Sequence, residues 1–188
     1  MMKNTVKRCS WVSSDPLYQR YHDEEWGVPE FDSVKLFELL CLEGQQAGLS
    51  WITVLKRRQE YRSVFFQFDP KKIVTLSEED IEQLMQSSNI IKHRKKIHSI
   101  VQNAKAYLRL SDQGVSFGEW VWELIGGRPV VNHWPDASLV PVMTQESKTM
   151  SIALKRHGFT FVGPTICYAF MQAAGMVFDH AGECYLAK

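Results

Sequence analysis

The placement of Glu43 is the first sign of chemistry in this sequence. In a helix predicted over residues 33–48, Glu43 shares one stripe with Leu36 and Leu40, at spacings of three and four residues. A carboxylate on an apolar stripe is buried, which is unfavourable unless the group is paired, hydrogen-bonded or protonated. We interpret Glu43 either as a carboxylate that binds a ligand or as a structural carboxyl that caps a neighbouring backbone N–H group.

Two cysteines and two histidines near the chain ends form a second candidate site. His180 and Cys184 are four residues apart, the spacing that places two side chains on one face of a helix. Cys9 and His22 are thirteen residues apart near the other end. Two thiolates and two imidazoles make a tetrahedral set that suits Zn²⁺, and such a site would join the two terminal segments. The spacing also fits four unrelated residues near mobile ends.

A short turn over residues 157–165 separates two predicted helices. Gly163 and Pro164 open the second of these helices, and the exposed N–H groups of a helix N-terminus bind phosphate well. Gly163 lets a ligand approach the backbone, and Thr165 follows in the first turn. A hairpin of two helices grips a DNA backbone in this way without reading its sequence. A plain connection between two helices fits the same residues.

The composition is that of a soluble globular protein. The chain has 188 residues, of which 45% are apolar and 23% charged, enough for one compact domain with a real core. No apolar run approaches the ~20 residues of a membrane span, which excludes a membrane partner. The N-terminus lacks the apolar core of a signal peptide, so we expect a cytoplasmic protein whose four cysteines are core thiols or metal ligands rather than disulfides.

The charge balance restricts how this chain attracts nucleic acid. Its net charge is +1, so any attraction must come from a local patch. Lys155 and Arg156, directly before the turn, are candidates for phosphate contacts. The basic run over residues 92–96 fits either a phosphate-facing patch or a solvated helix face.

The elements that must position these residues are predicted to be helices throughout. We expect an all-α protein with one globular domain over residues 1–188, in which a polar excursion over residues 126–144 is the main irregular segment. Convincing alternating strands are absent. Helices are predicted over residues 33–48, 51–65, 78–84, 92–110, 120–125, 146–157 and 164–173.

Several segments together resemble a known family, 3-methyladenine DNA glycosylase I, the constitutive enzyme of bacteria. The longest are YHDEEWG at residues 21–27 and LEGQQAGLSW at residues 42–51. RCSW at 8–11, DPLY at 15–18 and FVGPT at 161–165 extend the resemblance. It therefore spans nearly the whole chain, from Cys9 to Cys184.

The resemblance implies a fold of the helix–hairpin–helix superfamily and a repair enzyme. Such an enzyme flips N3-methyladenine out of double-stranded alkylated DNA and excises it hydrolytically, leaving an abasic site and the free base. It also implies one structural Zn²⁺ ion, held by Cys9, His22, His180 and Cys184. It implies a base pocket in which Glu43, the residue we assign as catalytic, is surrounded by Tyr21, Trp26 and Trp51.

Four more residues are assigned near that pocket from their positions. Gly48 and Leu49 lie at the junction of two helices, where Leu49 would enter the gap left by the flipped base. A core leucine in a tight turn is the alternative. Gln46 is interpreted as a hydrogen-bonding partner of the purine edge or as a cap of local backbone. Tyr168 lies on an apolar helix, where a place in the core is favoured over a place in the pocket.

No general base is assigned. Many members of the superfamily carry an Asp beyond the hairpin, and the nearest one here is Asp179, sixteen residues after Gly163. Asp179 adjoins His180, which indicates a place at the zinc end, and the family resembled lacks the usual Asp. Activation of water then falls to Glu43, to a backbone carbonyl or to the excised purine.

Two other classes of function remain open at this point. One is a non-catalytic, zinc-stapled module that recognises alkylated or distorted DNA, which the missing Asp favours. The other is a helical scaffold with a structural metal. A purine-sized aromatic pocket with a carboxylate favours the enzyme, because a protein that binds only the backbone needs no such pocket. We expect a monomer.

Overall fold

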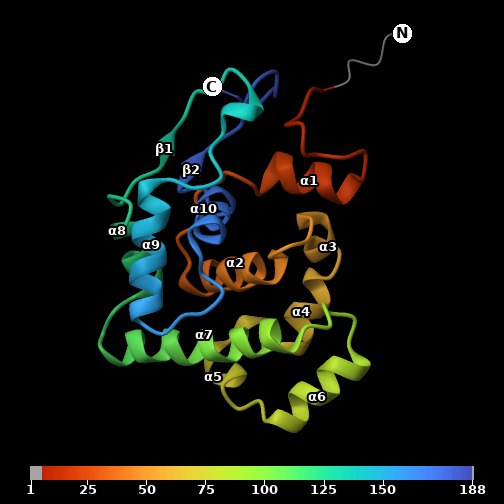
Figure 1. Ribbon diagram of the computed structural model, residues 1–188, viewed down its shortest axis with the longest axis vertical. Helices are drawn as coiled ribbons and strands as arrows, with labels where there is room; N and C mark the ends of the chain where they lie inside the picture. The colour runs from red at the N-terminus through yellow and green to blue at the C-terminus, as the bar shows by residue number, and fades with distance from the viewer. Residues whose placement is uncertain (1–5, 188) are drawn as a thin grey trace.

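The computed structural model describes residues 6–187, which form ten α-helices and two short strands (Figure 1). The helices are α1 Pro16–Glu24, α2 Ser33–Gln46, α3 Trp51–Leu55, α4 Arg58–Val64, α5 Pro70–Ile73, α6 Glu78–Ser87, α7 Arg94–Asp112, α8 Phe117–Glu123, α9 Gln145–Arg156 and α10 Pro164–Ala173. The strands are β1 Val130–Val131 and β2 Val177–Phe178, and two 3₁₀ turns are η1 Phe66–Phe68 and η2 Ala137–Leu139. The prediction of a mostly helical single domain is confirmed.

Helix α2 lies at the centre of the molecule. It packs against α10 on one side and α7 on the other, with α3 and α8 near its ends (Figure 1). Leu36, Phe37 and Leu40 of this helix have no exposed surface. Burial of each such side chain contributes roughly 1.5–3 kcal/mol to the stability of the fold. The stripe that carries Glu43 is therefore the face of α2 that packs into the core.

Local capping signals explain where the main helices begin. The Asp32 carboxylate accepts hydrogen bonds from the backbone N–H groups of Val34 and Lys35, both at 2.9 Å, and so begins α2. Ser77 and Asp80 form a reciprocal capping box at the start of α6, which begins at residue 78 as predicted. Pro164 occupies the first turn of α10, also as predicted, where its missing N–H is not needed.

The helical predictions differ from the structure in three places, one of which is the short helix α5, which was not predicted. The helix expected over residues 51–65 is two helices, because the chain turns at Lys56 and Arg57 between α3 and α4. Helix α1 was not predicted at all. Its signals are present, since the Asp15 carboxylate caps the N–H of Leu17 at 3.0 Å and Pro16 follows directly.

The expectation of no strands is wrong for one short pair. Strands β1 and β2 are parallel, with Val130 opposite Val177 and Val131 opposite Phe178. Two residues a strand are too few to show an alternating pattern, which is why the sequence does not reveal them. The pair attaches the excursion over residues 126–144 to the C-terminal segment, next to His180. In the described part of the chain, no helix is long and apolar enough to cross a membrane.

Candidate functional site

Glu43 faces a cavity of about 380 Å³ between α1, α2, α3 and α10. A volume of this size is in the range of small-molecule sites. The residues that line it are Trp11, Tyr18, Tyr21, Trp26, Glu43, Gln46, Ser50, Trp51, Ala169 and Gln172. The structure therefore brings Glu43 together with four of the residues assigned to its pocket from the sequence, Tyr21, Trp26, Gln46 and Trp51.

The carboxyl of Glu43 is buried without a protein partner. Its side chain is 3% exposed, and Oε2 accepts no hydrogen bond from any described residue. Burial raises the pKa of Glu43 to about 8. Within the described residues, the indole N–H of Trp51 is also buried and unpaired. An unmet polar group in a protein interior costs about 1–3 kcal/mol, so both atoms are suited to a ligand that enters the cavity.

Aromatic rings form most of the cavity wall. The rings of Tyr21 and Trp51 have centroids 5.4 Å apart, and those of Trp11 and Trp26 are 5.1 Å apart. Tyr21 is 2% exposed, and burial, together with the charge of Glu43, raises the pKa of its hydroxyl well above its usual value. Tyr21 is thus a neutral ring at any ordinary pH. Rings arranged this way offer π faces to a flat or cationic ligand.

Five lining residues were not assigned from the sequence, Ser50 and Ala169 among them. Trp11 and Tyr18 lie in the RCSW and DPLY segments, and Gln172 lies on α10. Trp11 and Tyr18 have ring centroids 5.0 Å apart. Trp11 and Tyr18 could have been assigned to the cavity from the sequence, because both lie in segments that carry the family resemblance. Nothing in the sequence pattern pointed to Gln172.

Tyr168 lies outside the Glu43 cavity. It lines a neighbouring cavity of about 320 Å³ that shares Trp11, Trp26, Ala169 and Gln172 with the first. Its hydroxyl donates a hydrogen bond of 2.5 Å to Asp179, and it is 2% exposed. The structure therefore agrees with the core position that the sequence favoured for Tyr168.

Asp179 is held by four donors rather than by the metal ligands. Its carboxylate accepts hydrogen bonds from Asn132 at 2.7 Å, Trp134 at 2.8 Å, Tyr168 at 2.5 Å and Gln172 at 2.9 Å. The expected place at the zinc end is therefore wrong in detail, since Asp179 joins the excursion to α10. A carboxylate with this many donors is poorly available as a general base.

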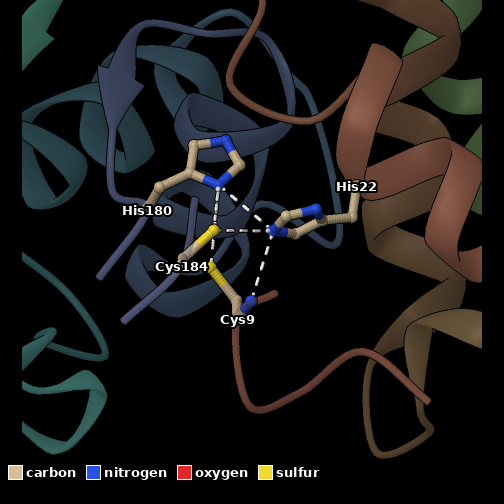
Figure 2. A group of neighbouring side chains, drawn as sticks. All are labelled: Cys9, His22, His180 and Cys184. Carbon is tan, nitrogen blue, oxygen red and sulfur yellow. Dashed lines mark hydrogen bonds between the residues drawn. The ribbon is translucent and has the colours of Figure 1, made fainter. Parts of the chain in front are cut away.

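Cys9, His22, His180 and Cys184 converge in one buried cluster (Figure 2). Their ligand atoms all lie within 4.8 Å of one another. Cys184 Sγ is 3.4 Å from His22 Nε2 and 3.5 Å from His180 Nδ1, and the two nitrogens are 3.2 Å apart. Tetrahedral bonds of about 2.3 Å to sulfur and about 2.0–2.1 Å to nitrogen bring neighbouring donors this close. The cluster can hold a metal ion.

The outer nitrogens of the two histidines are also occupied. His22 Nδ1 lies 2.8 Å from Asp23, whose carboxylate accepts three further bonds from Arg8. His180 Nε2 lies 3.3 Å from the carbonyl oxygen of Trp26. These contacts fix each ring with its inner nitrogen toward the cluster, as metal-binding histidines require. Burial, with the neighbouring His22, lowers the pKa of His180 to about 4, which keeps the ring in the neutral form that binds metals.

One detail of the metal prediction is wrong. His180 and Cys184 were expected on one helical face, but they follow strand β2 in a turn outside any helix. The turn still places Cys184 Sγ close to His180 Nδ1, as one face of a helix would. The ring of Trp26 stacks edge-on against His180, with centroids 4.7 Å apart. The cluster therefore supports one wall of the Glu43 cavity.

The corner between α2 and α3 is exposed. Gly48 has a φ of +76°, which favours glycine, and a Cβ there would meet nothing within 4 Å. Leu49, the next residue, is 41% exposed, so the alternative of a core leucine is wrong. Ser50 and Trp51, which follow, line the cavity. An apolar side chain thus stands in solvent directly beside the cavity.

The predicted hairpin consists of α9, α10 and the turn between them (Figure 1). Gly163 caps α10 with an ordinary φ of −65°, and a Cβ at this position would meet nothing within 4 Å. Thr165 in the first turn of α10 is exposed. The turn is held from behind by α7, where Asn103 accepts from Thr160 N–H at 2.8 Å and donates to Thr160 O at 3.2 Å. The N-terminal end of α10 is left open to a ligand.

The basic run over residues 92–96 is exposed except for its last residue, and several of its charges contact other parts of the protein. Lys92 donates to backbone carbonyls at the end of α6, and Arg94 pairs with Glu82. Lys96 is only 5% exposed. The alternative of a solvated face fits residues 92–95, which are exposed, whereas Lys96 is buried.

Comparison with known proteins agrees with these features. The methyladenine glycosylase family model matches residues 11–187, and the chain therefore belongs to this family. It is 55% identical over 179 residues to DNA-3-methyladenine glycosylase 1 of Escherichia coli, which covers 95% of this chain and 96% of that protein. It is also 55% identical over 177 residues to DNA-3-methyladenine glycosylase of Haemophilus influenzae, covering 94% and 96%.

Solved structures give the same result. A crystal structure of 3-methyladenine DNA glycosylase I superposes with a TM-score of 0.94 at 53% identity, covering 97% of this chain and all of that one. The Staphylococcus aureus enzyme, whose structure concerns 3-methyladenine recognition, has a TM-score of 0.90 at 38% identity and 95% coverage of both chains.

Proposed function

We propose that this protein is a monofunctional DNA glycosylase that excises 3-methyladenine from alkylated double-stranded DNA and leaves an abasic site. The observation that carries the proposal is the unpaired carboxyl of Glu43, buried in an aromatic cavity in a chain of the methyladenine glycosylase family. The relatives of known name act on the same base. The product is the free base, and the reaction is the first step of base excision repair.

Excision of this base requires little catalysis from the residues of the cavity. Methylation at N3 makes the purine cationic and weakens its bond to the sugar, so the base is already a good leaving group. The protein must select the lesion and hold it out of the stack. A cationic purine that packs against the rings of Tyr21 and Trp51 gains a cation–π attraction that normal adenine lacks, worth about 2 kcal/mol when desolvated.

Glu43 supplies the second part of this selection. Its carboxyl is neutral in the empty cavity at pH 7, because burial raises its pKa to about 8. A cationic base beside it favours the ionised form, which accepts hydrogen bonds from the exocyclic amino group of adenine. Binding of the lesion thus pairs two charges that are each unfavourable alone. A neutral adenine gives no such gain.

Contacts with the duplex fall to two exposed features. Leu49 enters the gap left by the flipped base, because it is an exposed apolar side chain next to the cavity. The backbone at Gly163 and Thr165, at the open end of α10, receives a phosphate of the DNA. Gly48 permits the tight corner that presents Leu49.

The metal of the Cys₂His₂ cluster is Zn²⁺ in this proposal. Its bonds hold the segment of Cys9 against the segment of Cys184 and support Trp26 through His180. The ion has no place in the reaction, because all four donors are protein side chains and leave no open position. We further propose that the protein works as a monomer in the cytoplasm, as expected for a bacterial DNA repair enzyme.

A second function is favoured by one observation, the occupied carboxylate of Asp179. Without a free general base, the protein would be a zinc-stapled module that recognises alkylated DNA without cleaving the glycosidic bond. A cationic leaving group makes a strong base unnecessary, which is why the enzyme is the better proposal.

The test is incubation of the metal-loaded protein with N-methylated duplex DNA, followed by chromatographic separation of the released purines. The enzyme releases 3-methyladenine and leaves strands that alkali cleaves at abasic sites. Tight binding of the methylated duplex without release would establish the recognition module instead. Absence of both binding and release would leave only the helical scaffold.

A further inference from the structure

Lys96 is a buried cation without a carboxylate partner. It is 5% exposed, and its ammonium donates to the backbone carbonyls of Gln45 at 2.8 Å and Ala47 at 2.6 Å. Within residues 6–187 it forms no ion pair. Burial of a charge that is met only by neutral acceptors is expensive, and burial lowers the pKa of this group. The backbone N–H group of the C-cap residue Ala47 makes no capping bond to a described residue at the end of α2, so the ammonium of Lys96 satisfies the carbonyls of Gln45 and Ala47.

The contacts of Lys96 fix one particular corner. Gln45 and Ala47 flank Gln46 at the end of α2, after which the chain turns through Gly48 to Leu49. Figure 1 shows the end of α2 that leads into α3 on the same side of the molecule as the beginning of α7. The ammonium thus holds the peptide groups on both sides of Gln46 while the corner itself remains open to solvent.

Further bonds on the buried side hold the same segment. The side chain of Gln45 donates to the carbonyl of Lys96 at 2.8 Å and accepts from the hydroxyl of Tyr61 at 3.2 Å. That hydroxyl accepts from the N–H of Ile91 at 3.2 Å. Gln45 has no exposed surface. Helices α4 and α7 therefore anchor the corner on its buried side, whereas Leu49 on the other side is 41% exposed.

We propose that Lys96 is a positioning residue for base flipping, which holds the α2–α3 corner so that Leu49 enters the duplex while Glu43 stays in the cavity wall. The inference rests on the proposed glycosylase function. An apolar side chain can stabilise a gap in the duplex only when its backbone does not yield on insertion. Lys96 provides that rigidity, because its two bonds and the helix it belongs to join the corner to the core.

The variant that tests this role is Lys96→Met, which keeps the length of the side chain and removes both hydrogen bonds. The matched control is Lys105→Met, the same change at an exposed position of the same helix. Three quantities are measured in each protein. They are the single-turnover release of 3-methyladenine from duplex DNA, the affinity for a duplex with a stable abasic-site analogue relative to an intact duplex, and the affinity for free 3-methyladenine by tryptophan fluorescence.

A positioning role changes the first two and spares the third. We expect Lys96→Met to slow release on the order of tenfold and to lose the preference for the abasic duplex, with the affinity for the free base unchanged. Lys105→Met leaves all three unchanged. A parallel loss in all three quantities would mean that Lys96 is only structural, and an unchanged release rate would also overturn the proposal.

Leu49→Ala shows whether Lys96 acts through the corner. If it does, adding Lys96→Met to Leu49→Ala causes little further loss, whereas independent effects would multiply. If Lys96→Met does not fold, Lys96→Gln, whose amide reaches one carbonyl, takes its place in the same comparisons. Failure of the wild-type protein to release the base would refute the glycosylase function, and the abasic-duplex preference would still report on Lys96.

Discussion

The buried carboxyl of Glu43 is needed for ligand binding, but it lowers the stability of the folded protein. Its carboxyl has a pKa of about 8 in the folded protein and an ordinary value of 4.5 when exposed. Because the folded pKa is the higher one, the unfolded chain ionises first as the pH rises. Stability is therefore lost between pH 4.5 and 8. Burial of a group that is useful only when a ligand enters is a common feature of functional sites.

The variant Glu43→Gln should remove this dependence. Its amide is neutral at every pH, so the variant and the wild type should differ little in stability at pH 4. At pH 8 we expect the variant to be more stable by on the order of a few kcal/mol. Thermal unfolding of both proteins across this range measures the difference, in which the titration of all other groups cancels. Parallel curves would contradict the buried, unpaired carboxyl.

At the residue scale, the sequence predicted what depends on local pattern. The stripe with Leu36 and Leu40 was enough to place Glu43 in the interior. Lys96 could not be predicted in the same way, because its acceptors lie fifty residues away and a run of basic residues is ordinarily solvated. Gln172 was missed for the same reason, since only the packing of α10 against α2 brings it to the cavity.

At the scale of elements, the two glycines of the hairpin have different tasks. Gly158 has a φ of +87°, and a Cβ there would lie 2.5 Å from a side-chain nitrogen of Arg109. Gly163 has an ordinary φ and open space around it. The fold therefore requires glycine at residue 158. At residue 163, glycine is required only by a ligand that approaches the backbone.

This difference predicts opposite effects of alanine. Gly158→Ala should lower the unfolding free energy by on the order of 1–2 kcal/mol, because of the left-handed backbone. Gly163→Ala should leave the melting temperature within about a degree and weaken binding to duplex DNA severalfold, because the methyl group keeps a phosphate away. Calorimetry and a salt-dependent binding assay measure the two effects. Normal DNA affinity in Gly163→Ala would remove the hairpin from the interface.

Helix ends were predictable where a side chain caps them. Elements that form only through packing between distant segments were not predictable. Asp32, Ser77 and Pro164 mark α2, α6 and α10 correctly. Strands β1 and β2 exist only because the excursion packs against the C-terminal segment, and neither has a pattern of its own. The turn that carries His180 and Cys184 depends on the same packing.

At the scale of the whole molecule, the metal cluster joins the two ends of the chain. Cys9 lies before α1 and Cys184 after β2, and Figure 2 shows their side chains meeting beside the two histidines. His180 also contacts Trp26, so the cluster is continuous with the cavity wall. Loss of the ion should loosen the N-terminal segment and this wall together.

Substitution of the thiols tests that role. If the cluster holds the proposed zinc, Cys9→Ser and Cys184→Ser should each lose it and most of its stabilisation, and the double variant should be no less stable than either single one, because one ion is lost in all cases. Cys41→Ala is the matched control, since Cys41 is a buried thiol outside the cluster and its loss should leave one zinc per chain. Metal content and limited proteolysis measure the effect. Additive losses would mean that the thiols do not share an ion.

The central claim is that the buried carboxyl of Glu43 acts on the flipped base. The most direct test is the single-turnover rate of 3-methyladenine release from duplex DNA, compared between the wild type and Glu43→Gln, both folded and loaded with metal. Loss of the carboxylate charge that forms beside the cationic base predicts a fall of about a hundredfold or more. An equal rate in the two proteins would contradict the claim and leave the aromatic walls alone to account for excision.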